Sequence, residues 1–213
     1  MDSVTFEAIV RDPVLEGFID GLDLSNLSNE WIGDEFAIEL AHILIHNESI
    51  LELNLSSNLI GNDGMDALGE CLVFNTTLQY LNLGFNPISD LSALRTFSYL
   101  ESLSLEDVRL DRDGLVHISK LLPGRLKYLN LASNKIKDVS PLAQALIQNT
   151  CLLELDLSVN EINEPKPLAN MFSRNHSLEK VHLQYNPLSK SSCLLLLNSV
   201  SSKSNLMYFN LTN

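Results

Sequence analysis

Basic residues are scarce in this sequence, and the shortage narrows the choice of partners. The chain has 14 lysines and arginines against 27 aspartates and glutamates, which gives a formal net charge of −13. Nucleic acids and anionic membranes bind basic surfaces, so the composition argues against both. The charge would attract a basic or mixed-charge protein, although it would also serve solubility alone. The sequence leaves these two interpretations open.

Cysteine and long apolar runs are scarce as well. Cys71, Cys151 and Cys193 lie in apolar contexts without metal-binding or redox spacing, so we expect structural thiols in a reducing compartment. The first residues contain no apolar signal-peptide core, and the longest leucine run, 194–197, is too short to span a bilayer. These absences predict a cytoplasmic protein, in which Asn-x-Ser/Thr triplets such as 75–77 are by-products of the composition.

What the sequence has in abundance is a repeated pattern. From Ile50 to Ile60, apolar residues stand at positions 1, 4, 6 and 11, and an asparagine stands at position 9. Clear copies also begin at Leu78, Leu126, Leu152 and Leu178, a degraded copy at Leu100 and a last one at Leu206, and an early one is visible from Ile19 to Leu24. From residue 50 onward the copies start 22–28 residues apart, a period that indicates a stacked repeat architecture.

Each copy predicts a strand, an asparagine turn and, in most cases, a helix. Positions 4 to 6 alternate as a half-buried strand does, and helical stripes such as Phe36, Leu40 and Leu44 follow. Strands stack about 4.8 Å apart whereas helices need about 8–10 Å, so the helix side must fan out. We therefore expect an α/β fold, a right-handed solenoid with a parallel sheet on the concave face and helices on the convex face.

The repeat covers nearly the whole chain and predicts one elongated domain. Residues 1–18 do not fit it, and we assign them as an N-terminal helical cap, because an end repeat has an uncovered apolar flank. Residues 19–213 are expected to form about eight repeats, with the first strand around Leu22–Leu24 and the last repeat incomplete. The strand at Tyr208 would then be an uncapped edge, which leads to the hypothesis of self-association.

Three departures from the pattern carry their own predictions. Only 22 residues separate Leu78 from Leu100, so we expect a short turn or a 3₁₀ helix there. Val108 stands where the asparagine should be, so a turn amide or carbonyl must find another partner. The run Cys193–Leu197 is almost entirely apolar, which predicts a helix buried on two sides.

The frame Leu-x-x-Leu-x-Leu-x-x-Asn-x-Ile, in five clear copies, resembles the leucine-rich repeat family. Periods near 28 residues and endings such as 67–77 look like its ribonuclease-inhibitor subclass, which is intracellular and includes ribonuclease inhibitors, Ran GTPase-activating proteins, tropomodulins and sensor regions of innate immune receptors. The unit at 78–99 looks more like the phosphatase-regulator subclass. The resemblance covers about residues 19–213 and implies a horseshoe fold and binding of proteins.

Relatives in this family bind proteins with the inner strand face, so the resemblance directs attention to side chains that alternation leaves exposed there. Aromatic anchors dominate binding energy, and carboxylates beside them would steer a basic partner. Aromatic residues also fill a pleated surface well without any ligand. The predicted partner-binding residues are Glu52, Tyr80, Phe85, Glu106, Asp107, Tyr128, Glu154, Asp156, His182, Tyr185 and Tyr208.

The sequence favours neither catalysis nor a metal or cofactor site. His42 and His46 have a possible zinc spacing, but the leucine stripe of their helix turns them outward and no third ligand is placed. His182 has no recognisable nucleophile on its own strand. We predict a non-enzymatic scaffold without a cofactor. The alternatives are a regulator of an enzyme, such as a GTPase activator or an inhibitor, and a bacterial effector that binds a protein in a host cytosol.

Overall fold

The computed structural model of the protein describes residues 26–110, 112–122, 124–201 and 205–212. Within them, short strands alternate with helices along the chain. The strands are β1 (Glu52–Asn54), β2 (Tyr80–Asn82), β3 (Ser102–Ser104), β4 (Tyr128–Asn130), β5 (Glu154–Asp156), β6 (Lys180–His182) and β7 (Tyr208–Asn210). The helices are α2 (Asp34–Leu44), α3 (Asn62–Leu72), the 3₁₀ helix η2 (Ser92–Thr96), α4 (Arg112–Leu121), α5 (Ser140–Leu146), α6 (Lys166–Arg174) and α7 (Lys190–Val200).

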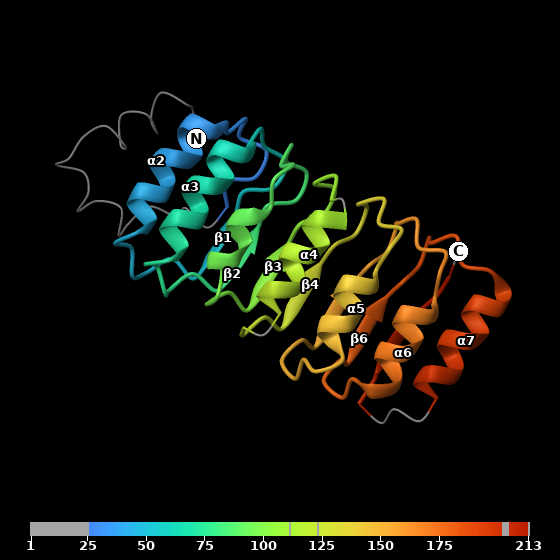
Figure 1. Ribbon diagram of the computed structural model, residues 1–213. Helices are drawn as coiled ribbons and strands as arrows, with labels where there is room; N and C mark the ends of the chain where they lie inside the picture. The colour runs from blue at the N-terminus through green and yellow to red at the C-terminus, as the bar shows by residue number, and fades with distance from the viewer. Residues whose placement is uncertain (1–25, 111, 123, 202–204, 213) are drawn as a thin grey trace.

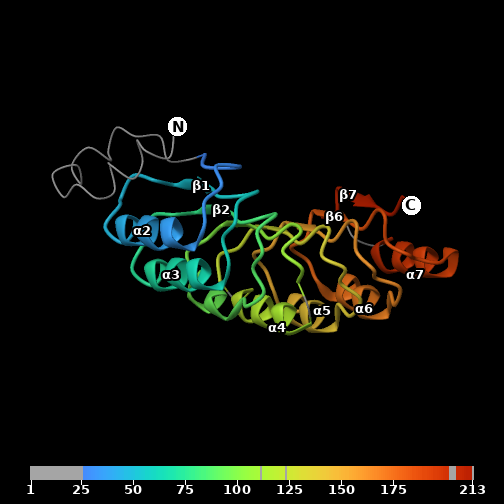
Figure 2. The same ribbon diagram turned by 90° about the horizontal axis from the view of Figure 1, so that it is seen from above.

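The strands form one parallel sheet in chain order, from β1 to β7. Adjacent strands pair residue for residue without an offset, so Leu53, Leu81 and Leu103 lie in one line across the sheet. The helices cover one side of the sheet, and the strands line the inside of the curve (Figures 1 and 2). This arrangement confirms the predicted α/β repeat architecture with its sheet on the concave face.

The core lies between the sheet and the helices and is built from columns of leucine. The central residue of each strand from β1 to β6, and the leucine two positions later, are at most 2 % exposed. The helices contribute Leu40, Leu68, Ile118, Leu142 and Leu168, each fully buried. Burial of each such side chain stabilises by about 1.5–3 kcal/mol before ordering entropy is subtracted. The columns merge into one continuous core along the described repeats.

An asparagine ladder joins consecutive repeats at the turn after each strand. Oδ1 of Asn134 accepts hydrogen bonds from the backbone N–H groups of Val108 (3.0 Å) and Leu110 (3.1 Å). Its Nδ2 donates to the carbonyl oxygens of Leu105 (2.6 Å) and Ala132 (3.0 Å). Each rung therefore satisfies backbone groups of its own repeat and of the preceding one. The rungs are the buried residues Asn58, Asn86, Asn134, Asn160 and Asn186.

Val108 interrupts the ladder, and the structure shows how the turn adapts. In the intact turn, the N–H of Ile60 donates to Oδ1 of Asn86 at 3.0 Å. In the next repeat, the equivalent N–H of Ile88 donates to the backbone carbonyl of Asn86 at 2.8 Å. The side chain of Val108 is 1 % exposed and packs in the core. The prediction that a turn group must find another partner is confirmed.

A second set of asparagines closes the loops between helix and strand. Nδ2 of Asn75 donates to the carbonyl oxygen of Leu44 (2.6 Å), and its Oδ1 accepts from the N–H of Leu78 (2.9 Å). Asn175 makes the equivalent bond to Leu146 at 2.7 Å. Asn75 and Asn175 are buried, so the Asn-x-Ser/Thr triplets that they begin serve the fold.

The first repeat lies three residues later in the chain than the sequence frame predicts. Asn26 pairs with Asn54, and the N–H of Leu27 donates to the carbonyl of Asn54, as that of Leu55 does one repeat later. Leu27 therefore matches Leu55, so the predicted frame, which gives that place to Leu24, is wrong; the strand predicted around residues 22–24 lies outside the described residues. The error arises because Glu30 stands at position 9, where an asparagine fixes the frame in most other repeats. The predicted cap at 1–18 lies outside the described residues.

Two further elements, η2 and α7, test predictions made from the sequence, and only the prediction for η2 is confirmed. The short third repeat contains the 3₁₀ helix η2, as predicted. In α7, by contrast, Leu196 is buried but Leu194, Leu195 and Leu197 are 40–53 % exposed. The prediction of a helix buried on two sides is wrong, because α6 packs along one side of α7 and leaves these leucines uncovered. None of the helices in the described part of the chain combines the length and apolar character that crossing a membrane requires.

Candidate protein-binding face

The outward side chains of the strands form two straight rows across the concave face. Each strand from β1 to β6 buries its central residue, Phe209 of β7 is partly buried, and the residues on either side turn outward, as in a pleated strand. The first row, which we call the position-3 row, contains Glu52, Tyr80, Ser102, Tyr128, Glu154, Lys180 and Tyr208. The second, the position-5 row, contains Asn54, Asn82, Ser104, Asn130, Asp156, His182 and Asn210.

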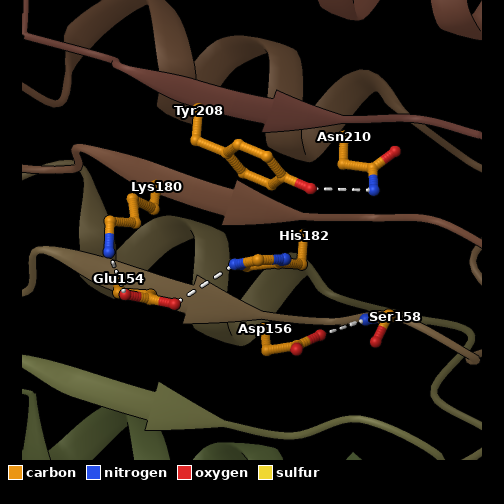
Figure 3. Close-up of polar contacts among 7 residues, drawn as sticks. All are labelled: Glu154, Asp156, Ser158, Lys180, His182, Tyr208 and Asn210. Carbon is orange, nitrogen blue, oxygen red and sulfur yellow. Dashed lines mark hydrogen bonds and ion pairs between the residues drawn. The ribbon is translucent and has the colours of Figure 1, made fainter.

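Three tyrosines give the position-3 row its largest contact area. Tyr128 is 39 % and Tyr208 43 % exposed, and Tyr80 is half-buried. The ring of Tyr208 lies against that of His182 with 4.9 Å between centroids, and its hydroxyl accepts a hydrogen bond from Nδ2 of Asn210 at 3.1 Å (Figure 3). Contacts of this kind restrict the rotation of the ring of Tyr208.

A polar cluster occupies the face over β5 and β6 (Figure 3). Glu154 lies between Lys180 and His182, with Oε2 at 3.2 Å from Nζ of Lys180 and Oε1 at 3.2 Å from Nε2 of His182. Oδ1 of Asp156 accepts a hydrogen bond from the backbone N–H of Ser158 at 2.8 Å. Glu154 therefore has its charge balanced within the chain, although the sequence predicts it as a contact for a partner.

Other carboxylates of the face are less well balanced. At the start of β4, Nζ of Lys127 lies 2.8 Å from Oε2 of Glu101, and this hydrogen bond raises the pKa of Lys127. Glu106 accepts a hydrogen bond from the side-chain amide of Asn130 at 3.2 Å, which carries no charge. Glu52 and Asp107 are exposed, and neither joins an ion pair within the described residues. Glu52, which pairs with Tyr80 across the sheet, and Asp107 therefore keep an unmatched negative charge within the described residues.

Position 8 of each repeat lies beyond the strand, in the turn at the rim of the face. Phe85, Asp107 and Tyr185 have φ of 59°, 47° and 58°, which is the left-handed region. A residue other than glycine adopts this conformation at a cost of about 1–2 kcal/mol. The turn directs Phe85 and Tyr185 outward, where they are 47 % and 64 % exposed. The predicted site thus divides into a strand face and a rim.

The rim contains exposed residues that the sequence prediction omitted. Val159 also occupies position 8, with φ of 53° and 49 % exposure. Trp31 and Leu59 lie two positions further along their turns and are 78 % and 53 % exposed. Val159 could have been found by reading position 8 in the copy that begins at Leu152. The misplaced frame of the first repeat hid the relation between Trp31 and Leu59.

The histidine pair and the cysteines lie away from this face. His42 and His46 are exposed on and just after α2, and the described residues contain no group of three histidine, cysteine, aspartate or glutamate side chains arranged to hold a metal ion. Cys71 is buried in the core, and burial raises the pKa of its thiol to about 12. The neutral thiol of Cys71 therefore packs as a small apolar side chain.

Known proteins resemble this chain both in the repeat pattern of the sequence and in the fold. A family model described as Leucine Rich repeat matches residues 46–69, 74–94, 126–140 and 148–164. Internalin C2 (inlC2) of Listeria monocytogenes has a similar structure, with a TM-score of 0.62 and 23 % identity over 97 % of this chain and 89 % of that one. Internalin inlF of the same organism gives 0.53 and 19 % over 99 % and 75 %.

A third similar structure is that of TLR13 in a complex with ssRNA13. It gives a TM-score of 0.56 and 21 % identity, covering 87 % of this chain and 27 % of TLR13. No curated protein shows significant sequence similarity to the chain. At these identities the structural similarity establishes the fold alone, so the absence of a nucleic-acid partner stays a prediction.

Proposed function

Because the chain is a leucine-rich repeat protein, we propose that it is a non-enzymatic scaffold that holds a partner protein against its concave strand face. The observation that carries this proposal is the position-3 row, in which Tyr80, Tyr128 and Tyr208 stand outward on strands that pair without offset. Aromatic side chains that are partly exposed on a rigid sheet are the usual anchors of protein interfaces. The free thiols suit a reducing cytoplasm.

The charges beside the tyrosines favour a basic or mixed-charge partner. Glu52 and Asp107 are unmatched within the described residues, whereas Lys127 and Lys180 each lie against a carboxylate. A partner with lysine or arginine opposite β1–β4 would meet complementary charge, which accelerates association more than it raises affinity. The same carboxylates would repel the phosphates of a nucleic acid.

Replacement of Tyr80, Tyr128 and Tyr208 by alanine together tests the proposal. After a partner has been captured from cytosol and purified, its affinity for the triple variant should fall at least about thirtyfold, because loss of one hot-spot residue costs about 2 kcal/mol. Calorimetry or surface plasmon resonance measures the change, and circular dichroism shows that the fold persists.

A matched control uses a tyrosine outside the face. Tyr99 is 38 % exposed, about as much as Tyr128, but it lies in the loop before β3. There its ring centroid is 5.7 Å from Cζ of Arg125. Tyr99→Ala should leave the affinity within about twofold, as surface changes away from a hot spot do. Equal affinities of the native protein and the triple variant would refute the concave-face proposal.

A further inference from the structure

The charges of the chain are divided unequally along its length. Residues 26–94, which we call the acidic repeats, contain ten aspartates and glutamates and no lysine or arginine. Residues 95–213 contain eleven aspartates and glutamates against thirteen lysines and arginines. The negative charge of the protein is thus concentrated at the N-terminal end of the solenoid. Any basic partner approaches this end preferentially.

Three exposed apolar side chains lie in adjacent turns of the same repeats, and we call Trp31, Leu59 and Phe85 the apolar rim. They are 78 %, 53 % and 47 % exposed. Backbone hydrogen bonds hold the turns side by side, because the N–H of Leu59 donates to Ile32 at 2.8 Å and that of Ser57 to Gly84 at 2.9 Å. The rim therefore presents tryptophan, leucine and phenylalanine along one edge of the solenoid.

The fold gains little from two of these side chains. Trp31 and Phe85 have left-handed backbones, with φ of 61° and 59°, where asparagine or glycine would be less strained. Their rings also leave much of their apolar area in water. The backbone strain and the exposure of Trp31 and Phe85 are expected of side chains that are stabilised by contact with another molecule.

We propose that the apolar rim docks a basic amphipathic segment of a partner protein, in which lysines or arginines flank large apolar side chains. The apolar part would cover the rim, and the cations would meet carboxylates of the same turns, such as the exposed Glu30 next to Trp31 in the chain. A second copy of this chain would bring the same negative charge and be repelled. Residues 1–25 carry six carboxylates against one arginine, so they too match the site poorly.

The rim site is independent of the proposed binding by the strand face, since it lies in the turns. Its test uses Trp31, which is the only tryptophan of the chain. In the free full-length protein, acrylamide should quench Trp31 almost as well as it quenches N-acetyltryptophanamide. Protection of Trp31 before any partner is added would mean that the chain itself covers the rim, and would overturn the proposal.

The binding step uses a synthetic helical peptide of leucine, lysine and arginine, with a control peptide that carries glutamate in place of each cation. The basic peptide should shift the emission of Trp31 to the blue in a saturable manner, with an affinity that falls at least about tenfold between 50 and 300 mM salt. The acidic peptide should cause no shift. An equal response to both peptides, or to neither, would overturn the proposal.

Matched variants locate the contact. Leu59→Ser and Phe85→Asn should each lower the affinity for the basic peptide at least about tenfold, since they remove apolar anchors. Tyr185→Asn changes the same turn position in the other part of the chain, with nearly the same φ, and should have no effect. Phe85→Asn and Tyr185→Asn should both keep or raise the melting temperature. An equal loss of binding in both variants contradicts the assignment.

The Tyr80, Tyr128 and Tyr208 triple variant separates this proposal from the strand-face function. It should bind the basic peptide as the native protein does, with an affinity within about twofold. A large loss in the triple variant, without loss in Phe85→Asn, would move the peptide to the strand face and refute the rim site.

Discussion

The acidic repeats, residues 26–94, and the repeats that follow share one scaffold but differ in how their charges are balanced. Both parts contain the leucine columns and rungs of the asparagine ladder, including Asn58 in the first and Asn160 in the second. All four ion pairs that join lysine or arginine to a carboxylate in the described residues fall after residue 94. The leucine and asparagine columns therefore set the fold, while the outward positions are free to carry different chemistry.

Position 3 shows the difference in a single pair of residues. Glu52 and Glu154 occupy the same place on β1 and β5. Glu154 lies between Lys180 and His182, whereas Glu52 joins no ion pair within the described residues. Two glutamates with the same backbone environment are thus a structural group in one part of the chain and an open charge in the other.

The largest loss of stability is expected from removal of a rung of the asparagine ladder, which both parts share. Asn134→Ala removes four side-chain hydrogen bonds at a buried position that is 1 % exposed. Each unsatisfied buried group costs about 1–3 kcal/mol, so we expect the free energy of unfolding to fall by at least about 3 kcal/mol. Urea unfolding followed by circular dichroism measures the change.

Asn130→Ala provides the control for this loss in the same repeat. Asn130 is half-buried, its Oδ1 accepts one bond from the N–H of Ala132 at 2.9 Å, and its Nδ2 donates one to Glu106 at 3.2 Å. Water can replace both partners, so the expected loss is below about 1 kcal/mol. Equal losses in the two variants would show that the ladder contributes nothing beyond an ordinary surface asparagine.

Substitution of the two glutamates at position 3, Glu52 and Glu154, should change the stability by a smaller amount. Glu154→Gln removes the ion pair with Lys180 and the charge that faces His182 from a side chain that is 30 % exposed, and should lower the free energy of unfolding by about 0.5–1 kcal/mol. Glu52→Gln should leave it unchanged or raise it slightly, because it removes a negative charge from a region that has no lysine or arginine. Thermal unfolding at low salt compares them, and a larger loss for Glu52→Gln would reverse the argument.

Charge reversal in two loops should give the smallest effects. Glu48→Lys places the first cation within the acidic repeats and should stabilise by about 0.3 kcal/mol. Glu161→Lys breaks an ion pair with Lys137, 3.2 Å long, and should destabilise by about the same amount. Both shifts should shrink in 1 M salt. Shifts of the same sign at low salt would contradict the division of charge.

The fold could be predicted from the sequence wherever apolar and asparagine columns coincide. Leu53 and Asn58 each mark a fixed place in a repeat, and two such marks determine both strand and turn. Glu30 removes one mark from the first repeat, and the frame was then misplaced by three residues. The run in α7 was misjudged for another reason, since apolar composition does not state how many neighbours a helix has.

The candidate site was less predictable, because its chemistry depends on side chains from different repeats. The position-3 row follows from alternation, so Tyr80 and Tyr128 were placed outward from the sequence alone. The ion pairs of Glu154 depend on side-chain conformations that no spacing specifies. The left-handed turn at Phe85 was hidden because phenylalanine gives no local signal for such a backbone.

Because the strands pair without offset, the outward side chains are regularly spaced across the sheet. Tyr80 and Tyr128 stand two strands apart, which is about 9.6 Å at the spacing of a sheet. Three residues of a polyproline II helix make one turn, rise about 9.3 Å and bring the side chain back to the same face. A polypeptide in this conformation, lying perpendicular to the strands, can therefore place every third side chain over one of the two tyrosines.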